Sequence, residues 1–425
     1  MTTTTATPIS YSQLIRQNAN FRWLWSGQIV SLLGDWFNLI ASAALLSELT
    51  DSGLAIGSLF VVRMLAPFMI TPFAGVIADR YNRKHILILT DVVRGVTVLG
   101  FLFVRRPEDV WLLYLLTAIQ LGTGGFFFPT RNAILPDLVK PEELGTANTL
   151  LSVTWSTMLT IGAALGGLVA GLWGNEPAFI IDAFTFALSA LCLMNIRYQM
   201  PQANDVASSD AKVNVLQQYL DGLRHLARYI DQLLIVLIKG VNAILISTGF
   251  QIVQVIIAER IFVIGEGGGI SLGLMFGVAG IGTGVGPILA RYITKDDDHA
   301  MRWAITISWL IASVGIVIVS TLASFPVVLL GTFLRGFGGG VVWVFSTQLL
   351  LQLVPEEIRG RVFATEYMMF TLFSAIGAAA VGWALDGIFD LAILMRVMGG
   401  LVIVPAILWI VWSLRQTKKP VLESN

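Results

Sequence analysis

Twelve apolar stretches, each about 20 residues or longer, dominate this 425-residue chain. A helix of that length crosses a bilayer, because it rises about 1.5 Å per residue over about 30 Å of hydrocarbon. Apolar residues make up 56% of the sequence and charged residues only 13%. The sequence therefore predicts an all-α integral membrane protein. Its predicted spans are 21–46, 54–78, 85–104, 109–130, 146–172, 176–196, 232–258, 268–292, 301–321, 325–350, 362–386 and 391–414.

The charge balance and the scarcity of ligand side chains exclude several other classes. Lys and Arg number 27, as do Asp and Glu, so the chain has no basic excess for binding nucleic acid. One cysteine and three histidines are too few for a disulfide framework or a metal centre. The sequence has no Walker A loop and no arrangement of nucleophile and base. We expect no cofactor, no metal, no nucleic-acid partner and no enzymatic activity.

The longest polar interruption follows the sixth span and divides the chain into two halves. Most loop lysines and arginines fall on the side of the two termini, which by the positive-inside rule places both termini in the cytoplasm and the protein in the cell membrane. The expected divisions are a cytoplasmic tail 1–20, a six-helix bundle 21–196, a cytoplasmic linker with an amphipathic helix 197–231, a second six-helix bundle 232–414 and a cytoplasmic tail 415–425.

Short matching strings relate the two halves. The motif Arg80-Tyr81-x-x-Lys84 recurs as Arg291-Tyr292-x-x-Lys295 in the second half. The string LVKPEELG at 138–145 similarly recurs as LVPEEIRG at 353–360. These matches occupy corresponding loops of a layout with six spans in each half. They predict two pseudo-symmetric six-helix bundles, an architecture that is typical of secondary transporters.

The loop after the second span carries a family resemblance. Residues 75–84, GVIADRYNRK, resemble the G-x-x-x-D-R-x-x-R-K signature of the major facilitator superfamily. SLLGDWF at 31–37, FFFPTRNAILPDLV at 126–139 and FIIDAFTF at 179–186 are similar to strings of its drug and siderophore exporter branch, which includes macrolide efflux proteins and the enterobactin exporter. The resemblance covers roughly 20–415 and implies the major facilitator fold and secondary active transport.

The resemblance also implies a cytoplasmic gate. Asp79 is expected to meet the start of the eleventh span, where Glu366 would engage Arg80 or Arg83. Lys84 equally suits a role in setting the topology. The predicted gate residues are Gly75, Asp79, Arg80, Arg83, Lys84 and Glu366.

Three charged residues fall near the middle of their spans, where an unpaired charge costs several kcal/mol. Asp35 and Arg63 have compatible depths on adjacent spans, so we expect them to pair. Asp35 is either the titrating carboxylate of a proton-coupled exporter or half of a permanent ion pair. Arg335 either attracts an anionic substrate group or bonds to the backbone of its own span.

Other intramembrane residues carry weaker expectations. Asp91 and Arg94 are spaced i, i+3 and are expected to pair. We expect Asp182 and Lys239 to have structural roles in helix packing. The polar residues expected to line a cavity are Gln28, Asn38, Gln120 and Asn242, and the glycines expected to pack helices are Gly162, Gly166 and Gly167.

These patterns favour a secondary transporter that works by alternating access. We expect proton-coupled efflux of amphiphilic small molecules such as drugs, by a monomer in the lipid bilayer. One alternative is an exporter or flippase of a siderophore-like or lipid-like metabolite. Another is a non-transporting membrane sensor that signals through 197–231.

Overall fold

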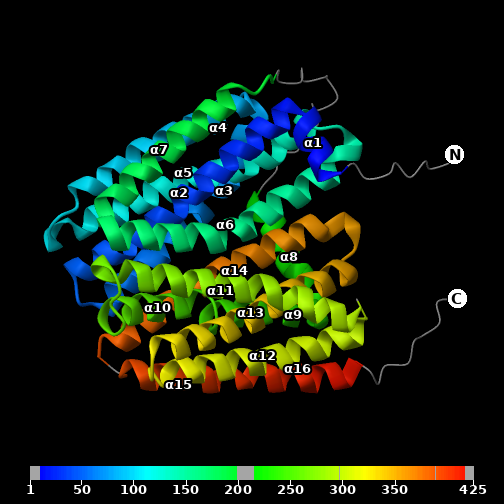
Figure 1. Ribbon diagram of the computed structural model, residues 1–425. Helices are drawn as coiled ribbons and strands as arrows, with labels where there is room; N and C mark the ends of the chain where they lie inside the picture. Colours follow the sequence, from blue (N-terminus) through cyan, green and yellow to red (C-terminus); the bar gives the residue numbers. More distant parts are fainter. Residues whose placement is uncertain (1–9, 199–214, 296, 388, 417–425) are drawn as a thin grey trace, which may run out of the picture. The chain divides into compact units, whose positions relative to one another are not determined.

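The computed structural model describes residues 10–198, 215–295, 297–387 and 389–416, and that part of the chain contains helices and no β-strand (Figure 1). Twelve of its helical segments are long and apolar enough to cross a membrane, which confirms the predicted all-α membrane fold. These segments are Ala19–Leu49, Gly53–Thr71, Arg83–Phe103, Pro107–Leu138, Pro141–Trp173, Asn175–Met194, Ile230–Arg260, Glu266–Thr294, Asp298–Ser320, Phe325–Leu353, Arg361–Leu385 and Leu391–Leu414.

The chain forms two compact units. The N-terminal unit comprises Met1–Asp51, Val62–Val213 and Ala258–Leu274, and the C-terminal unit comprises Ser52–Val61, Asn214–Ile257 and Met275–Asn425. The helices of the N-terminal unit are α1 (Tyr11–Gln17), α2 (Ala19–Leu49), most of α3 (Gly53–Arg80), α4 (Arg83–Leu99), α5 (Val110–Leu138), α6 (Leu144–Trp173) and α7 (Asn175–Met194).

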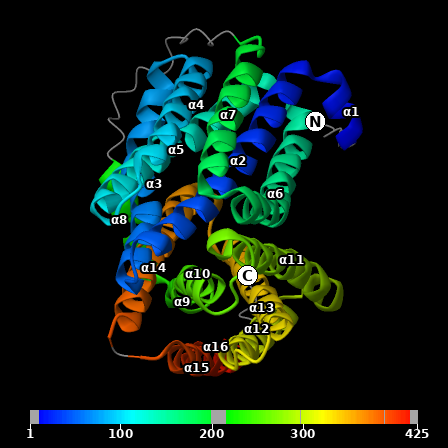
Figure 2. The same cartoon turned by 60° about the vertical axis from the view of Figure 1, so that its left-hand side comes forward.

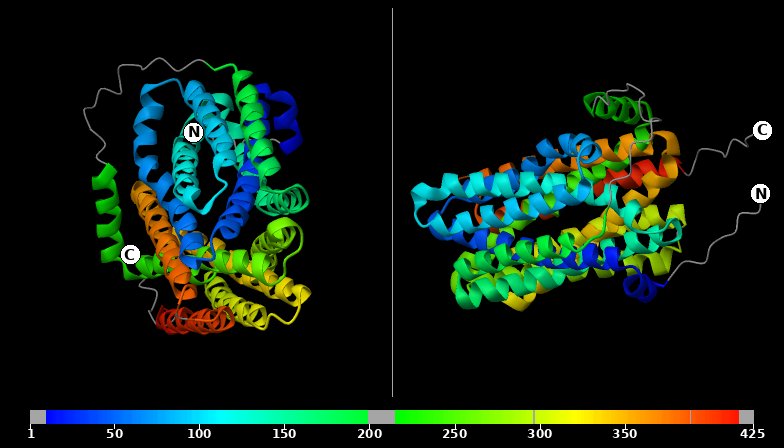
Figure 3. Two further views of the ribbon diagram at one scale, coloured as in Figure 1. Left: turned by 90° about the vertical axis from the view of Figure 1, so that its left-hand side faces the viewer. Right: turned by 90° about the horizontal axis from the view of Figure 1, so that it is seen from above.

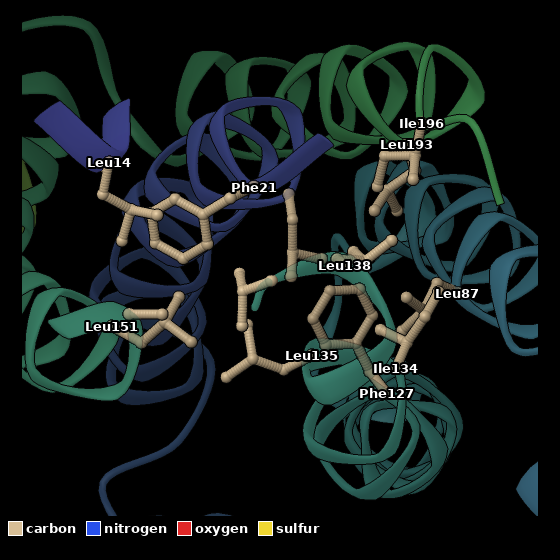
Figure 4. Packing of buried hydrophobic residues seen from close by; sticks show 13 residues of the cluster. Leu14, Phe21, Leu87, Phe127, Ile134, Leu135, Leu138, Leu151, Leu193 and Ile196 are labelled. Atoms are coloured by element: carbon tan, nitrogen blue, oxygen red, sulfur yellow. The ribbon is translucent and has the colours of Figure 1, made fainter. Parts of the chain in front are cut away.

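In the N-terminal unit, α2 packs against both α6 and α7, and α4 packs between α5 and α7 (Figures 1 and 2). Asn18 begins α2, because its side chain accepts a hydrogen bond from the amide of Phe21. Near this end, buried apolar side chains from six helices of the unit pack together in one cluster (Figure 4). The cluster comprises Leu14, Phe21, Leu24, Leu87, Phe127, Ile134, Leu135, Leu138, Val139, Ala147, Leu151, Leu193 and Ile196.

The C-terminal unit holds the later helices and the first turns of α3. Its helices are α8 (Val215–Arg228), α9 (Ile230–Leu245), most of α10 (Thr248–Arg260), most of α11 (Gly269–Thr294), α12 (Asp298–Ser320), α13 (Phe325–Leu353), α14 (Glu356–Leu385), α15 (Leu391–Leu401) and α16 (Ile403–Gln416). Helices α12 and α13 lie side by side, and α15 and α16 pack on α12 (Figure 2). Helix α9 packs against α13 and α14.

The start of α3 belongs to the C-terminal unit because the end of α14 caps it. The Asp386 carboxylate accepts hydrogen bonds from the Gly53 amide, from the Leu54 amide at 3.1 Å and from the Ser52 hydroxyl at 2.6 Å. An anion there also suits the positive end of the helix dipole.

The amphipathic helix α8 lies beside α14 (Figure 3). Leu226 is fully buried, whereas Leu220 and Leu223 are exposed. Gly222 permits the close approach, since a Cβ at that position would overlap Thr365 of α14. Asp221 and Arg361 add an ion pair at 3.6 Å. This helix is therefore held by α14 along one face and leaves leucines exposed on another.

Candidate functional site

A group of buried charges lies inside the N-terminal unit, on α2 and α4. An Nη2 atom of Arg94 donates to Oδ1 of Asp35 at 2.5 Å, and its Nη1 lies 3.7 Å from Oδ1 of Asp91. The guanidinium of Arg94 also stacks on the Phe186 ring of α7, 4.1 Å from the ring centre. The side chains of Arg94 and Asp91 are 6% and 0% exposed, whereas Asp35 is 25% exposed. Asp35 is thus the most exposed member of this group.

The expected pair of Asp35 with Arg63 is corrected, because the cation in contact with Asp35 is Arg94. Arg63 on α3 lies within electrostatic range of Asp35 and Asp182, and its Nη1 is buried without a hydrogen-bond partner. Depth along a span cannot tell which neighbouring helix faces a residue, and α4 presents Arg94 to the buried face of α2. The expected i, i+3 contact between Asp91 and Arg94 is confirmed.

Asp182 of α7 is a third buried carboxyl in this region. It is fully buried and lies within electrostatic range of Asp35 and both arginines. Its hydrogen-bond partners are uncharged: Nε2 of Gln120 at 3.5 Å and the hydroxyl of Thr185 at 3.4 Å. Room for Asp182 against α2 comes from Gly34, where any Cβ would overlap the side chains of Asp182 and Thr185.

These five residues form what we call the charge cluster: Asp35, Arg63, Asp91, Arg94 and Asp182. It brings together two predicted candidates, Asp35 and Arg63, with Asp91 and Arg94, which were expected to pair with each other, and with Asp182, which was assigned to packing. The unequal numbers of acidic and basic residues in these spans could have pointed to the cluster. The spans carry three carboxyls and two guanidiniums, so one carboxyl is left without a cation of its own.

The predicted polar cavity residues of the N-terminal unit do not gather at one point. Gln28 is buried, and its Oε1 accepts a hydrogen bond from Arg131 at 2.9 Å. Gln120 donates a hydrogen bond from Nε2 to the carboxylate of Asp182. Asn38 is fully buried, and neither atom of its amide has a hydrogen-bond partner. Sequence reasoning placed Arg131 in a loop because it ended the fourth span at 130, whereas α5 continues to Leu138.

Three of the predicted gate residues, Arg83, Lys84 and Glu366, have partners within their own units. Glu366 forms a buried ion pair with Lys239 of α9 within the C-terminal unit, and its predicted engagement with Arg80 or Arg83 stays a prediction. Lys239 also donates to the Thr347 hydroxyl at 2.6 Å and lies 4.3 Å from the ring centre of Trp343. Glu366 faces α9 because it lies on the buried side of α14, nearly three helical turns past its start.

Arg83 and Lys84 fasten the ends of neighbouring helices. Arg83 pairs with Asp137 of α5 at 2.8 Å. Lys84 donates to the carbonyls of Met194 and Ile196, both at 2.8 Å, and so places a cation at the negative end of α7. Arg80 is exposed. The side chains of Gly75 and Asp79 lie outside the described residues, so their predicted roles stay predictions.

Tyr198 extends the contact around Asp137. Its hydroxyl donates to Oδ2 of Asp137 at 3.1 Å. Burial raises the pKa of Tyr198, and the charge of Asp137 raises this pKa further. The tyrosine therefore stays a hydrogen-bond donor at neutral pH.

The glycines of α6 lie at close helix contacts. A Cβ at Gly162 would overlap the Trp36 ring of α2, and a Cβ at Gly166 would press on the backbone of Phe37. A Cβ at Gly167 would overlap the backbone of Gly273. Small residues let helix backbones approach to this degree.

The remaining predicted residues, Arg335 and Asn242, lie together in the C-terminal unit. The seventh span is interrupted between α9 and α10, and Arg335 of α13 donates from Nη1 to the carbonyl of Ile246 at the interruption. Asn242 lies one turn earlier, and its carbonyl accepts the amides of Ile246 and Ser247 at 3.0 and 2.9 Å. Arg335 thus bonds to the backbone of the seventh span and not, as one expectation had it, to that of the tenth.

The twelve spans and the ionisable side chains buried within them define a multi-pass helical membrane protein of the transporter class. The chain belongs to the Major Facilitator Superfamily, whose family model matches residues 24–296. It is 27% identical over 385 residues to the uncharacterized MFS-type transporter YfiS of Bacillus subtilis (strain 168), covering 87% of each chain.

Further likenesses agree with this assignment. The chain is 30% identical over 207 residues to the putative bacilysin exporter BacE of Bacillus subtilis (strain 168), covering 49% of this chain and 50% of that one. A crystal structure of the nucleoside transporter NupG shares the fold with a TM-score of 0.72 at 16% identity, covering 93% of this chain and 99% of that chain. The protein is therefore a membrane transporter of this superfamily with exporters among its relatives, and it is not an enzyme.

Proposed function

We propose that this transporter exports amphiphilic small molecules in exchange for protons by alternating access. The observation that carries the proposal is the imbalance of the charge cluster. Three carboxyls, Asp35, Asp91 and Asp182, face two guanidiniums, which are always charged. With every carboxyl ionised the cluster has one net negative charge in a region from which water is largely excluded. One bound proton makes it neutral.

Proton uptake is a property of the whole cluster. Coupled carboxyls share a titration, so the proton does not belong to a single residue. Asp35 is the residue through which the proton exchanges, since its side chain is the most exposed of the three carboxyls. Asp182 is the residue on which the proton is best held, because its hydrogen-bond partners are all neutral.

Two further observations support export of amphiphilic compounds. Gln28, Asn38, Gln120 and Asn242 place a few buried polar groups among apolar helices, as sites for amphiphilic ligands do. The name of BacE, a putative exporter, favours outward transport. We assign the residues of the 75–84 loop to the cytoplasmic gate, the termini to the cytoplasm of the cell, and 197–231 to the linker between the bundles.

The test compares proton-driven efflux with substrate exchange. Right-side-out or inverted vesicles from cells without their own exporters are loaded with a panel of lipophilic dyes. We expect protonophore, Asp35→Asn and Asp182→Asn each to reduce dye efflux at least tenfold. Exchange of labelled for unlabelled dye needs no net proton movement, so it should persist in both variants. The control variant is Glu108→Gln, which neutralises an exposed carboxylate outside the cluster.

Two results would count against proton coupling through this cluster. One is protonophore-sensitive efflux that stays at the wild-type rate in both aspartate variants. The other is efflux that ignores protonophore altogether. Loss of exchange together with efflux would instead show that the variants had lost substrate binding, and the cluster would then be a binding site and not a coupling site.

A further inference from the structure

The interruption of the seventh span leaves backbone groups that a continuous helix would satisfy. Helix α9 ends at Leu245 and α10 begins at Thr248. Asn242 receives two amides at the interruption, while the carbonyl of Ile246 is met by the side chain of Arg335. Unwound backbone inside a membrane is tolerated where protein groups satisfy it, and in transporters it marks binding sites.

Arg335 is a buried cation without a counter-ion. Arg335 is only 5% exposed. Within the described part of the chain, no carboxylate lies at ion-pair distance from its guanidinium. Its contacts are the Ile246 carbonyl, Oε1 of Gln254 at 3.5 Å and the Phe250 ring at 4.6 Å from the centre. The other buried cation of this unit, Lys239, has Glu366. A guanidinium stays charged, so its burial calls for an anion.

Polar atoms around Arg335 are also without partners. Nε of Arg335 and Nε2 of Gln254 are buried donors with no acceptor. Oδ1 of Asn242 is a buried acceptor with no donor. Gln254 and Asn242 are 0% and 3% exposed. These atoms come from α9, α10 and α13, and they offer a donor of the guanidinium itself, a donor of Gln254 beside it and an acceptor of Asn242.

We propose that Arg335, Gln254 and Asn242 bind the carboxylate end of a transported amphiphile. The guanidinium with its unpaired Nε and the Nε2 group of Gln254 suit the two oxygens of a carboxylate, and Asn242 suits a neighbouring N–H or O–H group of the same molecule. The substrate class is therefore an amphiphile with one carboxylate and a nearby hydrogen-bond donor. This proposal rests on the proposed export function for its substrate.

Binding at this site is coupled to the interruption of the seventh span. A carboxylate that takes the guanidinium of Arg335 competes with the carbonyl of Ile246 for the same donor. Release of that carbonyl frees the junction of α9 and α10 to change its backbone conformation. The ligand and the interrupted backbone of the seventh span thus compete for one hydrogen-bond donor, so ligand binding favours a different backbone conformation there.

The test uses two probes that differ in charge alone. Dansylglycine carries a carboxylate, and dansylglycinamide replaces it with a neutral amide. Their binding to the purified full chain in phosphatidylcholine nanodiscs is followed by dansyl fluorescence without a proton gradient. We expect dansylglycine to bind at least tenfold more tightly, Arg335→Gln to remove this preference, and Arg396→Gln, at an exposed arginine of the same unit, to keep it.

A second variant keeps the proposal testable if Arg335→Gln fails to fold. Gln254→Glu has nearly the same shape and supplies a carboxylate from within the protein. We expect it to abolish the preference for dansylglycine while dansylglycinamide binding stays within twofold, and to raise the melting temperature. Wild-type protein that binds both probes equally, or Gln254→Glu that keeps the preference, would overturn the proposal.

Two further comparisons distinguish this proposal from lipid-headgroup binding and from the proposal of proton coupling. Displacement of dansylglycine by phosphatidylglycerol in the nanodisc would assign the anion site to lipid headgroups and overturn the assignment to a transported solute. Because binding is measured without a gradient, failure of proton coupling leaves this result intact. Conversely, a lost carboxylate preference leaves protonophore-sensitive efflux of neutral dyes unaffected.

Discussion

Replacement of Arg94 by methionine tests whether the charge cluster also holds the N-terminal unit together. Arg94 contacts Asp35 at 2.5 Å and Asp91 at 3.7 Å and stacks on Phe186 at 4.1 Å. Methionine retains much of the apolar stem and removes the charge. The net charge of the cluster then falls from minus one to minus two, because the three carboxyls keep only Arg63.

The expected cost follows from these contacts. Removing one partner of a buried ion pair costs about 3–5 kcal/mol, and a desolvated cation–π contact adds up to about 2 kcal/mol. Asp35 is a quarter exposed and keeps some hydration, so the lower end applies and Arg94→Met should cost about 3–4 kcal/mol. Asp35→Asn should cost about 1–2 kcal/mol, since Arg94 keeps Asp91.

The double variant Arg94→Met/Asp35→Asn restores the original net charge. It should cost only about 2 kcal/mol, which gives a coupling energy of about 2–4 kcal/mol between the two positions. A double variant whose cost equals the sum of the single costs would refute the reasoning, as would a cost below about 1 kcal/mol for Arg94→Met.

The assay uses the single cysteine of the chain. Cys192 lies on α7, is 8% exposed and faces α2, where a Cβ at Gly27 would touch it. A thiol-reactive dye therefore reports separation of α7 from α2. Labelling is followed across a titration of detergent with sodium dodecyl sulfate, and the midpoint gives the relative stability of each variant. Unchanged labelling of native protein in all variants shows that Cys192 itself has not been exposed.

Two further predictions concern the other helix contacts. Glu366→Gln leaves the Lys239 ammonium buried without its partner and should cost about 3 kcal/mol, whereas the double variant Glu366→Gln/Lys239→Met should cost less than the single change, measured as thermal unfolding in detergent. An equal or larger cost for the double variant would contradict this. Gly167→Val overlaps the backbone of α11, which no rotamer relieves, and should cost at least about 1–3 kcal/mol. Gly145→Ala, with open space around its Cβ, is the control; similar costs for both would refute close packing at Gly167.

The sequence predicted the spans well because a helix in lipid must satisfy its own backbone and present apolar side chains. Only these two requirements set the length and composition of each stretch. The fourth span was the exception: prediction ended it at 130, while α5 continues to Leu138. The helix contains Pro129 and Pro136 and buries Arg131 against Gln28, so its last two turns are less apolar than the rest.

The partners of the buried charges were harder to predict. Asp35 was matched with Arg63 by depth, whereas the structure matches it with Arg94. Glu366 was assigned to the gate by family resemblance, and its partner within the C-terminal unit, Lys239, was not predicted. Depth is a property of one helix and follows from residue number, but pairing depends on how each helix is rotated about its axis.

Sequence alone therefore determined that this chain is a twelve-span membrane protein of the Major Facilitator Superfamily, since hydrophobic length and the 75–84 motif are local properties. Tertiary structure decided which residues meet inside each unit. The meeting of Asp182 with Gln120, or of Arg335 with Ile246, joins positions far apart in the chain. Such contacts depend on the packing of small residues such as Gly34 between helices, and no local pattern encodes which helix face that packing selects.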